Sequence, residues 1–121
     1  MGQPEVHWEF WSENPKGVAD FYRKVFEWNI RAIPDLDYLL VETGGTGGIN
    51  GGILNVPGYK PGAWVNYVNV QSLDQSVEKA LKLGANVTKP KSPVPGMGWF
   101  AMLTDPQGNA FAMFQQDSQA K

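Results

Sequence analysis

The feature that most constrains the fold is a pattern that occurs twice, in which one strand and one amphipathic helix precede three short strands. The first copy begins near Val6 and the second near Trp64, and pairing Val18 with Val77 offsets them by about 59 residues. Each such unit can form a four-stranded sheet with a helix on one face, which leaves the other face in need of cover. The sequence therefore predicts an α+β fold in which tandem βαβββ modules form curved mixed sheets around a cleft.

The first copy opens with a clearly alternating strand over residues 6–11. Trp8 and Phe10 share one face, which we expect to be core. The opposite face carries three side chains that suit a ligand pocket better than open solvent: His7, Glu9 and Trp11. This face is the first indication of function.

A helix is expected directly after this strand, with Asn14 as its N-cap and Pro15 at its first position. Its apolar side chains recur at helical spacing: Val18, Phe21, Tyr22, Val25 and Phe26. We expect this stripe to pack on the Trp8 and Phe10 face of the strand.

The remaining elements repeat this order. The first copy continues with strands expected at 29–33, 37–42 and 49–55. The second copy has a strand at 64–70, a helix that is capped near Ser72 and ends at Gly84, and strands at 86–88, 99–104 and 110–115.

Two loops complete this description. A proline-rich loop is expected over 90–98, and Asp105 should cap a type I turn in the run DPQG. The glycine-rich run at 43–52 reads as a hairpin loop that leads into a weakened strand, because it lacks the Gly-Lys-Ser/Thr motif and following helix of a phosphate cradle.

Length and composition exclude several classes of protein. A chain of 121 residues fits a single domain over 1–121, with module one at about 5–56, a linker at about 57–62 and module two at about 63–116. The net charge of −2 gives no sign of the basic surface that nucleic acid binding needs. No stretch approaches the roughly 20 apolar residues of a membrane span. We therefore expect a soluble protein. Because the chain has no cysteine, nothing requires an oxidising compartment, and we expect a cytoplasmic location.

Three runs together resemble the vicinal oxygen chelate superfamily, which holds glyoxalase I, bleomycin-resistance proteins and extradiol dioxygenases. They are HWEFWSENPKGVADFYRKVFEW, WVNYVNVQSLDQSVEKALKLGANV and GMGWFAMLTDPQGNAFAMFQ, and they cover nearly the whole chain. The most similar branch is the small one related to lactoylglutathione lyase. The resemblance implies the glyoxalase/bleomycin resistance fold, with paired modules and a homodimer.

In the enzymes of this superfamily, the resemblance also implies a divalent metal held by one His or Glu from the first and last strand of each module. His7 matches the first ligand position, whereas the second falls near Gly51, the third on Val65 or Asn66, and the fourth on Ala112. Glycine, valine and alanine side chains cannot ligate a metal. We therefore expect no metal cofactor, with a divalent ion at His7 as the alternative.

Several roles stay open for the candidate residues. His7 could be a pocket-wall imidazole bonded to Glu9 or to a backbone carbonyl, a ligand-binding group or general base, or a metal ligand. Glu9 could be a general base or could anchor the loop after the first helix. Trp11 could stack on a ligand or pack in the core or at a dimer interface.

Three further residues have comparable alternatives. Packing is favoured for Trp64 and a pocket role for Trp99, while Asn66 could bond a ligand or face solvent. We expect a protein that binds a small organic molecule in an aromatic cleft near His7 and Glu9, with a metal-dependent lyase or isomerase of the glyoxalase type as the alternative. Whether it catalyses a reaction stays open.

Overall fold

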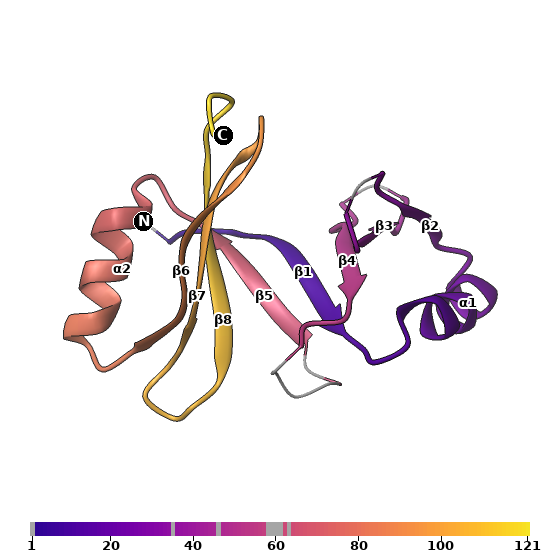
Figure 1. Cartoon of the computed structure of the whole chain (residues 1–121), viewed down its shortest axis with the longest axis horizontal. Coiled ribbons are helices and arrows are strands. Elements are labelled where there is room, and N and C mark those ends of the chain that lie inside the picture. The colour runs from indigo at the N-terminus through magenta and orange to yellow at the C-terminus, as the bar shows by residue number, and fades with distance from the viewer. Residues whose placement is uncertain (1, 35, 46, 58–61, 63) are drawn as a thin grey trace. The chain divides into compact units, whose positions relative to one another are not determined.

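The computed structural model describes residues 2–34, 36–45, 47–57, 62 and 64–121, and these residues contain two helices and eight strands (Figure 1). The chain divides into two compact units, which we call the first unit (His7–Val65) and the second unit (residues 1–6 and 66–121). The order of strand, helix and three strands occurs twice, which confirms the expected α+β fold class.

The sheet of the first unit has the strand order β2-β3-β4-β1. Its strands are β1 (Glu5–Trp11), β2 (Asn29–Ala32), β3 (Leu39–Glu42) and β4 (Gly51–Leu54). β1 runs parallel to β4, and β3 runs antiparallel to both β2 and β4. In this register Glu9 lies opposite Gly52.

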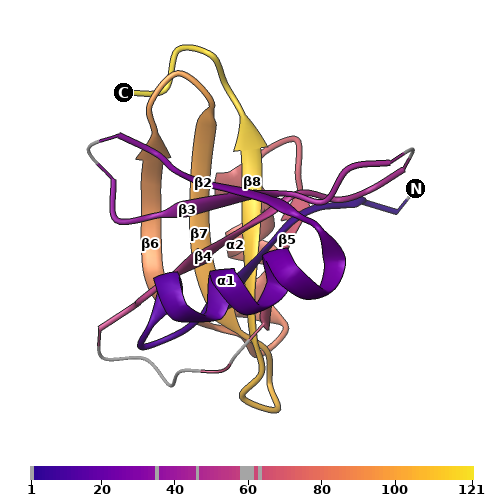
Figure 2. The same ribbon diagram turned by 90° about the vertical axis from the view of Figure 1, so that its right-hand side faces the viewer.

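Helix α1 (Pro15–Phe26) covers one face of this sheet, as Figure 2 shows. It begins where the sequence predicts, because the Asn14 side chain accepts a hydrogen bond from the Gly17 amide and Pro15 follows it. Trp8 and Phe10 pack with the helix against the core of this unit, as expected. The buried members of that core are Ala19, Ile30, Val41 and Ile53.

The expected apolar stripe of α1 is only partly buried. Val18 and Tyr22 pack against the core, whereas Phe21, Val25 and Phe26 are 58%, 51% and 54% exposed. The apolar stripe takes up more of the helix surface than the short strands of this sheet can cover, so its outer members stay at the surface. The helix therefore packs on the Trp8 and Phe10 face as expected, but only part of its apolar stripe is covered.

The second unit repeats this arrangement with the strand order β5-β8-β7-β6. Its elements are β5 (Trp64–Asn69), α2 (Leu73–Lys82), β6 (Asn86–Val94), β7 (Gly98–Thr104) and β8 (Ala110–Gln116). β5 runs parallel to β8, with Tyr67 opposite Ala112. Ser72 caps α2 as expected, and Gly84 follows it with a φ of +104°, a conformation that favours glycine.

The end of the second copy differs from the sequence prediction. Residues 86–94 form one strand, where we expected a short strand at 86–88 and then a proline-rich loop. Its pairing with β7 shifts register on either side of Lys89. β6 is the last strand in the order, so Pro90 and Pro93 are tolerated at this edge without removing a bond to a further strand.

Other local predictions have mixed outcomes. Asp105 accepts hydrogen bonds from the amides of Gln107 and Asn109, which confirms the predicted turn. β4 begins at Gly51 rather than at residue 49, and the predicted linker falls largely outside the described residues. In the described part of the chain, no helix combines the length and apolar character needed to cross a bilayer.

Candidate functional site

A buried carboxylate lies on the face of β1 that points away from α1. Glu9 is only 7% exposed, and the neighbouring same-face residue Trp11 is 4% exposed. The Trp11 Nε1–H donates to Glu9 Oε1 over 3.3 Å. Burying a carboxylate is costly unless it accepts hydrogen bonds, so this face is built around a polar group.

Tyr38, which precedes β3, brings a phenol to this group. Its hydroxyl lies 2.7 Å from His7 Nε2, and the phenol is close enough to Glu9 for that carboxylate to raise its pKa. The Tyr38 and His7 rings are stacked, with centroids 6.4 Å apart and planes at 18°. The structure therefore brings His7, Glu9 and Trp11 together with Tyr38 in one polar group, which we call the Glu9 cluster.

Two adjacent glycines in β4 make this arrangement possible. A Cβ at Gly52 would overlap the Tyr38 phenol, and a Cβ at Gly51 would overlap the Trp8 ring on the other face. Sequence analysis missed Tyr38, although paired glycines inside a strand are the usual sign that another group approaches closely. Gly51 and Gly52 thus leave space for aromatic side chains, and neither offers a side-chain ligand to a metal.

The protonation states in the cluster follow from its burial. Desolvation lowers the pKa of His7 below its ordinary value, so the imidazole is neutral at pH 7. Burial, followed by the charge and hydrogen bond of Glu9, raises the pKa of Tyr38 well above its ordinary value. The phenol therefore keeps its proton at any physiological pH.

The residues present do not fit a divalent metal held by the protein. Of the positions that the resemblance assigns to ligands, Gly51 and Ala112 have no side-chain donor atom, the third offers valine (Val65) or an amide (Asn66), and His7 Nε2 is engaged by Tyr38. Among the described residues there is no group of three or more His, Cys, Asp or Glu side chains that could hold an ion. A single imidazole would compete poorly with water for such a cation.

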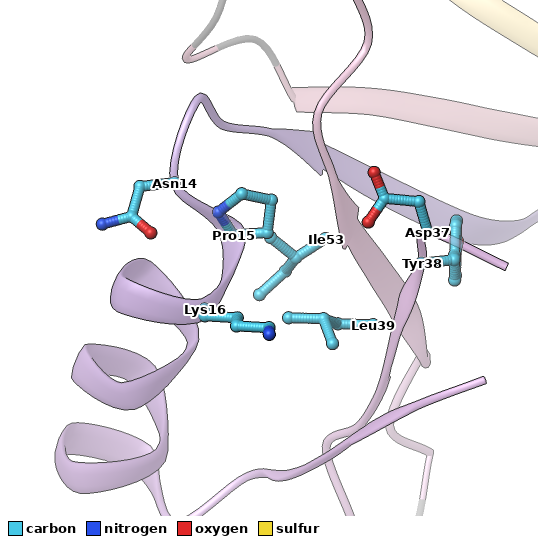
Figure 3. Close-up of a pocket in the computed structure, with 7 residues that line it drawn as sticks. All are labelled: Asn14, Pro15, Lys16, Asp37, Tyr38, Leu39 and Ile53. Atoms are coloured by element: carbon cyan, nitrogen blue, oxygen red, sulfur yellow. The ribbon is translucent and has the colours of Figure 1, made fainter. Parts of the chain in front are cut away.

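Tyr38 also lines a small pocket of about 180 Å³ beside the start of α1 (Figure 3). The pocket is lined by Asn14, Pro15, Lys16, Asp37, Tyr38, Leu39 and Ile53. Pockets that enclose drug-sized ligands are usually about 300–1,000 Å³. This hollow therefore has room for only part of such a molecule.

The other predicted site residues have different surroundings. Trp64 is 49% exposed and stacks on Phe10, with ring centroids 4.7 Å apart. Trp99 packs on the core under α2 and donates its indole N–H to Asp117 over 3.0 Å. Asn66 is exposed, and strand alternation puts it on the same face as Val68, which packs on that core. Asn66 and Trp99 both belong to the second unit, and their roles as ligand contacts stay predictions.

Comparison with known proteins gives a consistent picture of the fold. Residues 3–114 match a family model described as a glyoxalase-like domain. No curated protein sequence is significantly similar to this chain.

Solved structures share the fold at low sequence identity. A glyoxalase/bleomycin resistance protein/dioxygenase superfamily member from Vibrio splendidus 12B01 is 12% identical with a TM-score of 0.66, covering 96% of this chain and 100% of its own. Methylmalonyl-CoA epimerase from Streptomyces coelicolor, in complex with 2-nitronate-propionyl-CoA, is 10% identical with a TM-score of 0.67, covering 100% and 99%. A Legionella pneumophila protein described as an NAD-dependent benzaldehyde dehydrogenase is 16% identical with a TM-score of 0.65, covering 94% and 100%. Because these names describe unrelated chemistries, the shared fold does not identify a reaction.

Proposed function

Because this chain belongs to the glyoxalase-like domain family, we propose that it binds a small organic molecule at the Glu9 cluster without an obligatory metal. The observation that carries the proposal is the buried Glu9 carboxylate, which accepts a hydrogen bond from Trp11 and lies near Tyr38 on the sheet face opposite α1. A fold that needed only packing at this position would not require a carboxylate, whose burial costs free energy unless it is hydrogen-bonded.

The chemistry of the cluster suggests what kind of molecule it binds. Glu9 and the neutral His7 imidazole can accept hydrogen bonds, while the Trp11 and Tyr38 rings offer flat apolar surfaces. A ligand with N–H or O–H donors on a flat or apolar body matches this combination. Ligand recognition then depends on hydrogen bonding and stacking, with no step assigned to a metal.

The proposal can be tested with ligand-induced thermal shifts across a panel of small organic compounds. Glu9→Gln and His7→Asn should each reduce the shift given by a binding compound, and loss of one charged hydrogen bond should weaken affinity by about tenfold or more. Glu78→Gln on the exposed surface of α2 is the matched control and should leave the shift unchanged. If both cluster variants respond like the control, the ligand does not bind at the Glu9 cluster.

A metal-dependent lyase or isomerase is the second candidate, because His7 stands where the resemblance places the first metal ligand. Mass spectrometry of protein purified without chelator tests it. About one divalent ion per chain, lost in His7→Asn, would replace the metal-free proposal. The homodimer and the cytoplasmic location remain predictions.

A further inference from the structure

The pocket beside the start of α1 has one positive and one negative side chain in its lining. Lys16 lines it from α1, and Asp37 lines it from the segment before β3. Figure 3 shows the Lys16 side chain extending toward Leu39 and the Asp37 carboxylate directed toward the same hollow. Neither side chain forms an ion pair with another residue that the structure describes. Both charges are therefore available to a molecule that enters the pocket.

The rest of the lining is mostly apolar. Ile53 is buried, Leu39 and Pro15 are half-buried, and all three line the hollow. A dry apolar cavity of about 150 Å³ can hold a molecule of the size of benzene. The pocket of about 180 Å³ therefore has room for an apolar body of about six carbon atoms.

The two charged sides of the pocket favour one orientation of a bound molecule. The 12-residue helix α1 begins at Pro15, and the first turn of a helix attracts negative groups. Lys16 adds its positive charge on this side, and the first turn contains no acidic residue. Asp37 makes the side before β3 negative. A carboxylate is thus favoured beside α1, and an ammonium group beside Asp37.

We propose that this pocket is a binding site for a small apolar amino acid, whose carboxylate meets Lys16 and whose ammonium group meets Asp37. A zwitterion satisfies both charges at once, whereas a simple acid is repelled by Asp37 and a simple amine by Lys16. The apolar side chain then covers Leu39 and Ile53. This inference goes beyond the proposed function, because none of these contacts involves Glu9 or His7.

Titration of nitrogen-15-labelled protein with L-leucine, followed by proton–nitrogen correlation spectra, tests the proposal. The backbone signals of the pocket residues should shift and saturate, with a dissociation constant of about 1 mM, because both ion pairs are partly exposed. Two matched probes each lack one charge: 4-methylpentanoate has no ammonium group, and 3-methylbutylamine has no carboxylate. Each should bind about two- to fivefold more weakly than L-leucine.

Lys16→Gln and Asp37→Asn should each weaken L-leucine binding by about two- to fivefold. Both positions are exposed, so these variants should fold normally, which the rest of the spectrum reports. Lys24→Gln, at another exposed lysine of α1, is the matched control and should leave the affinity unchanged.

Three outcomes would overturn the proposal. They are the absence of saturable shifts at the pocket, wild-type affinity in both Lys16→Gln and Asp37→Asn, and binding of 4-methylpentanoate as tight as that of L-leucine. The result is separable from the proposed function, since a compound whose thermal shift depends on Glu9 would support that function even if the leucine titration shows no binding.

Discussion

The two units have the same order of elements, but the parallel strand pair of each carries different residues on the face opposite its helix. In the first unit Glu9 of β1 lies opposite Gly52 of the parallel strand β4. In the second unit Tyr67 of β5 lies opposite Ala112 of the parallel strand β8. The same pair of strands therefore presents a carboxylate beside a glycine in one unit and a phenol beside an alanine in the other.

These pairs have different neighbours. Tyr67 is 6% exposed and its ring lies 6.4 Å from that of Phe100, while Met102 and Ala112 are buried. Glu9 instead accepts from Trp11 and lies near Tyr38, a side chain for which Gly52 leaves space. The repeated order of strands and helix is enough to build a sheet with a helix on one face. The departure from the repeat, at Glu9 and Gly52, marks where function is expected.

The largest effect is expected when Gly52 of the first unit is replaced by alanine, the residue found at Ala112 of the second unit. A methyl group at Gly52 would overlap the Tyr38 phenol, so Gly52→Ala should lower the free energy of unfolding by about 2–3 kcal/mol. The reverse change, Ala112→Gly, removes one buried methyl group and should cost about 1 kcal/mol. Urea unfolding monitored by circular dichroism measures both.

Gly51→Ala separates loss of stability from loss of the cluster. Its methyl group would overlap Trp8 on the α1 side of the sheet, so a similar destabilisation is expected. Only Gly52→Ala should also change the NMR signals of the His7 imidazole, because that ring contacts Tyr38. Equal stabilities of Gly52→Ala and wild type, with an unchanged His7 signal, would mean that Gly52 does not define the cluster.

A smaller effect is expected from pH, and it should come from the first unit alone, because the only histidine is His7. Burial lowers its pKa in the folded protein, so the unfolded chain binds a proton first as pH falls through about 6.5. The stability contributed by neutral His7 is complete above about pH 6.5 and is lost as pH falls toward the lowered pKa.

Urea unfolding between about pH 7.5 and about pH 5.5 should therefore show stability falling with acidification, a window that lies above the ordinary carboxyl pKa values. His7→Asn, which has no group to protonate there, should give a flatter profile. A wild-type slope that persists in His7→Asn would assign the effect to other groups and contradict a buried, neutral imidazole.

Sequence reasoning succeeded where the signal was local. Asn14 before Pro15 marks the start of α1, and Gly84 marks the end of α2, because caps depend on neighbours within a few residues. The alternation of β1 likewise placed Glu9 and Trp11 on one face. These elements together fix the fold class.

The features that sequence reasoning missed depend on contacts between residues far apart in the chain. Tyr38 reaches His7, 31 residues away, only because β3 pairs with β4 and Gly52 leaves space between them. No periodic pattern near Tyr38 could have predicted that contact. The extension of β6 through Pro90 similarly depends on its place at the edge of the strand order, which composition alone does not give.

The smallest expected difference concerns one cation on each helix. On α1, Arg23 pairs with Asp20 at 2.7 Å and also donates to the Ile30 carbonyl of β2 at 2.7 Å. On α2, Lys82 pairs with Glu78 at 3.3 Å, and both side chains are largely exposed. Arg23→Ala should therefore cost about 1 kcal/mol in urea unfolding, and Lys82→Ala at most about 0.5 kcal/mol.

Arg23→Lys tests the reason for this difference. A lysine can keep the ion pair with Asp20, but it lacks the planar fork that reaches the carboxylate and the Ile30 carbonyl together. Most of the loss seen in Arg23→Ala should therefore persist in Arg23→Lys. Full recovery by lysine would assign the effect to charge alone, and the two helices would then differ only in how closely their surface ions pair.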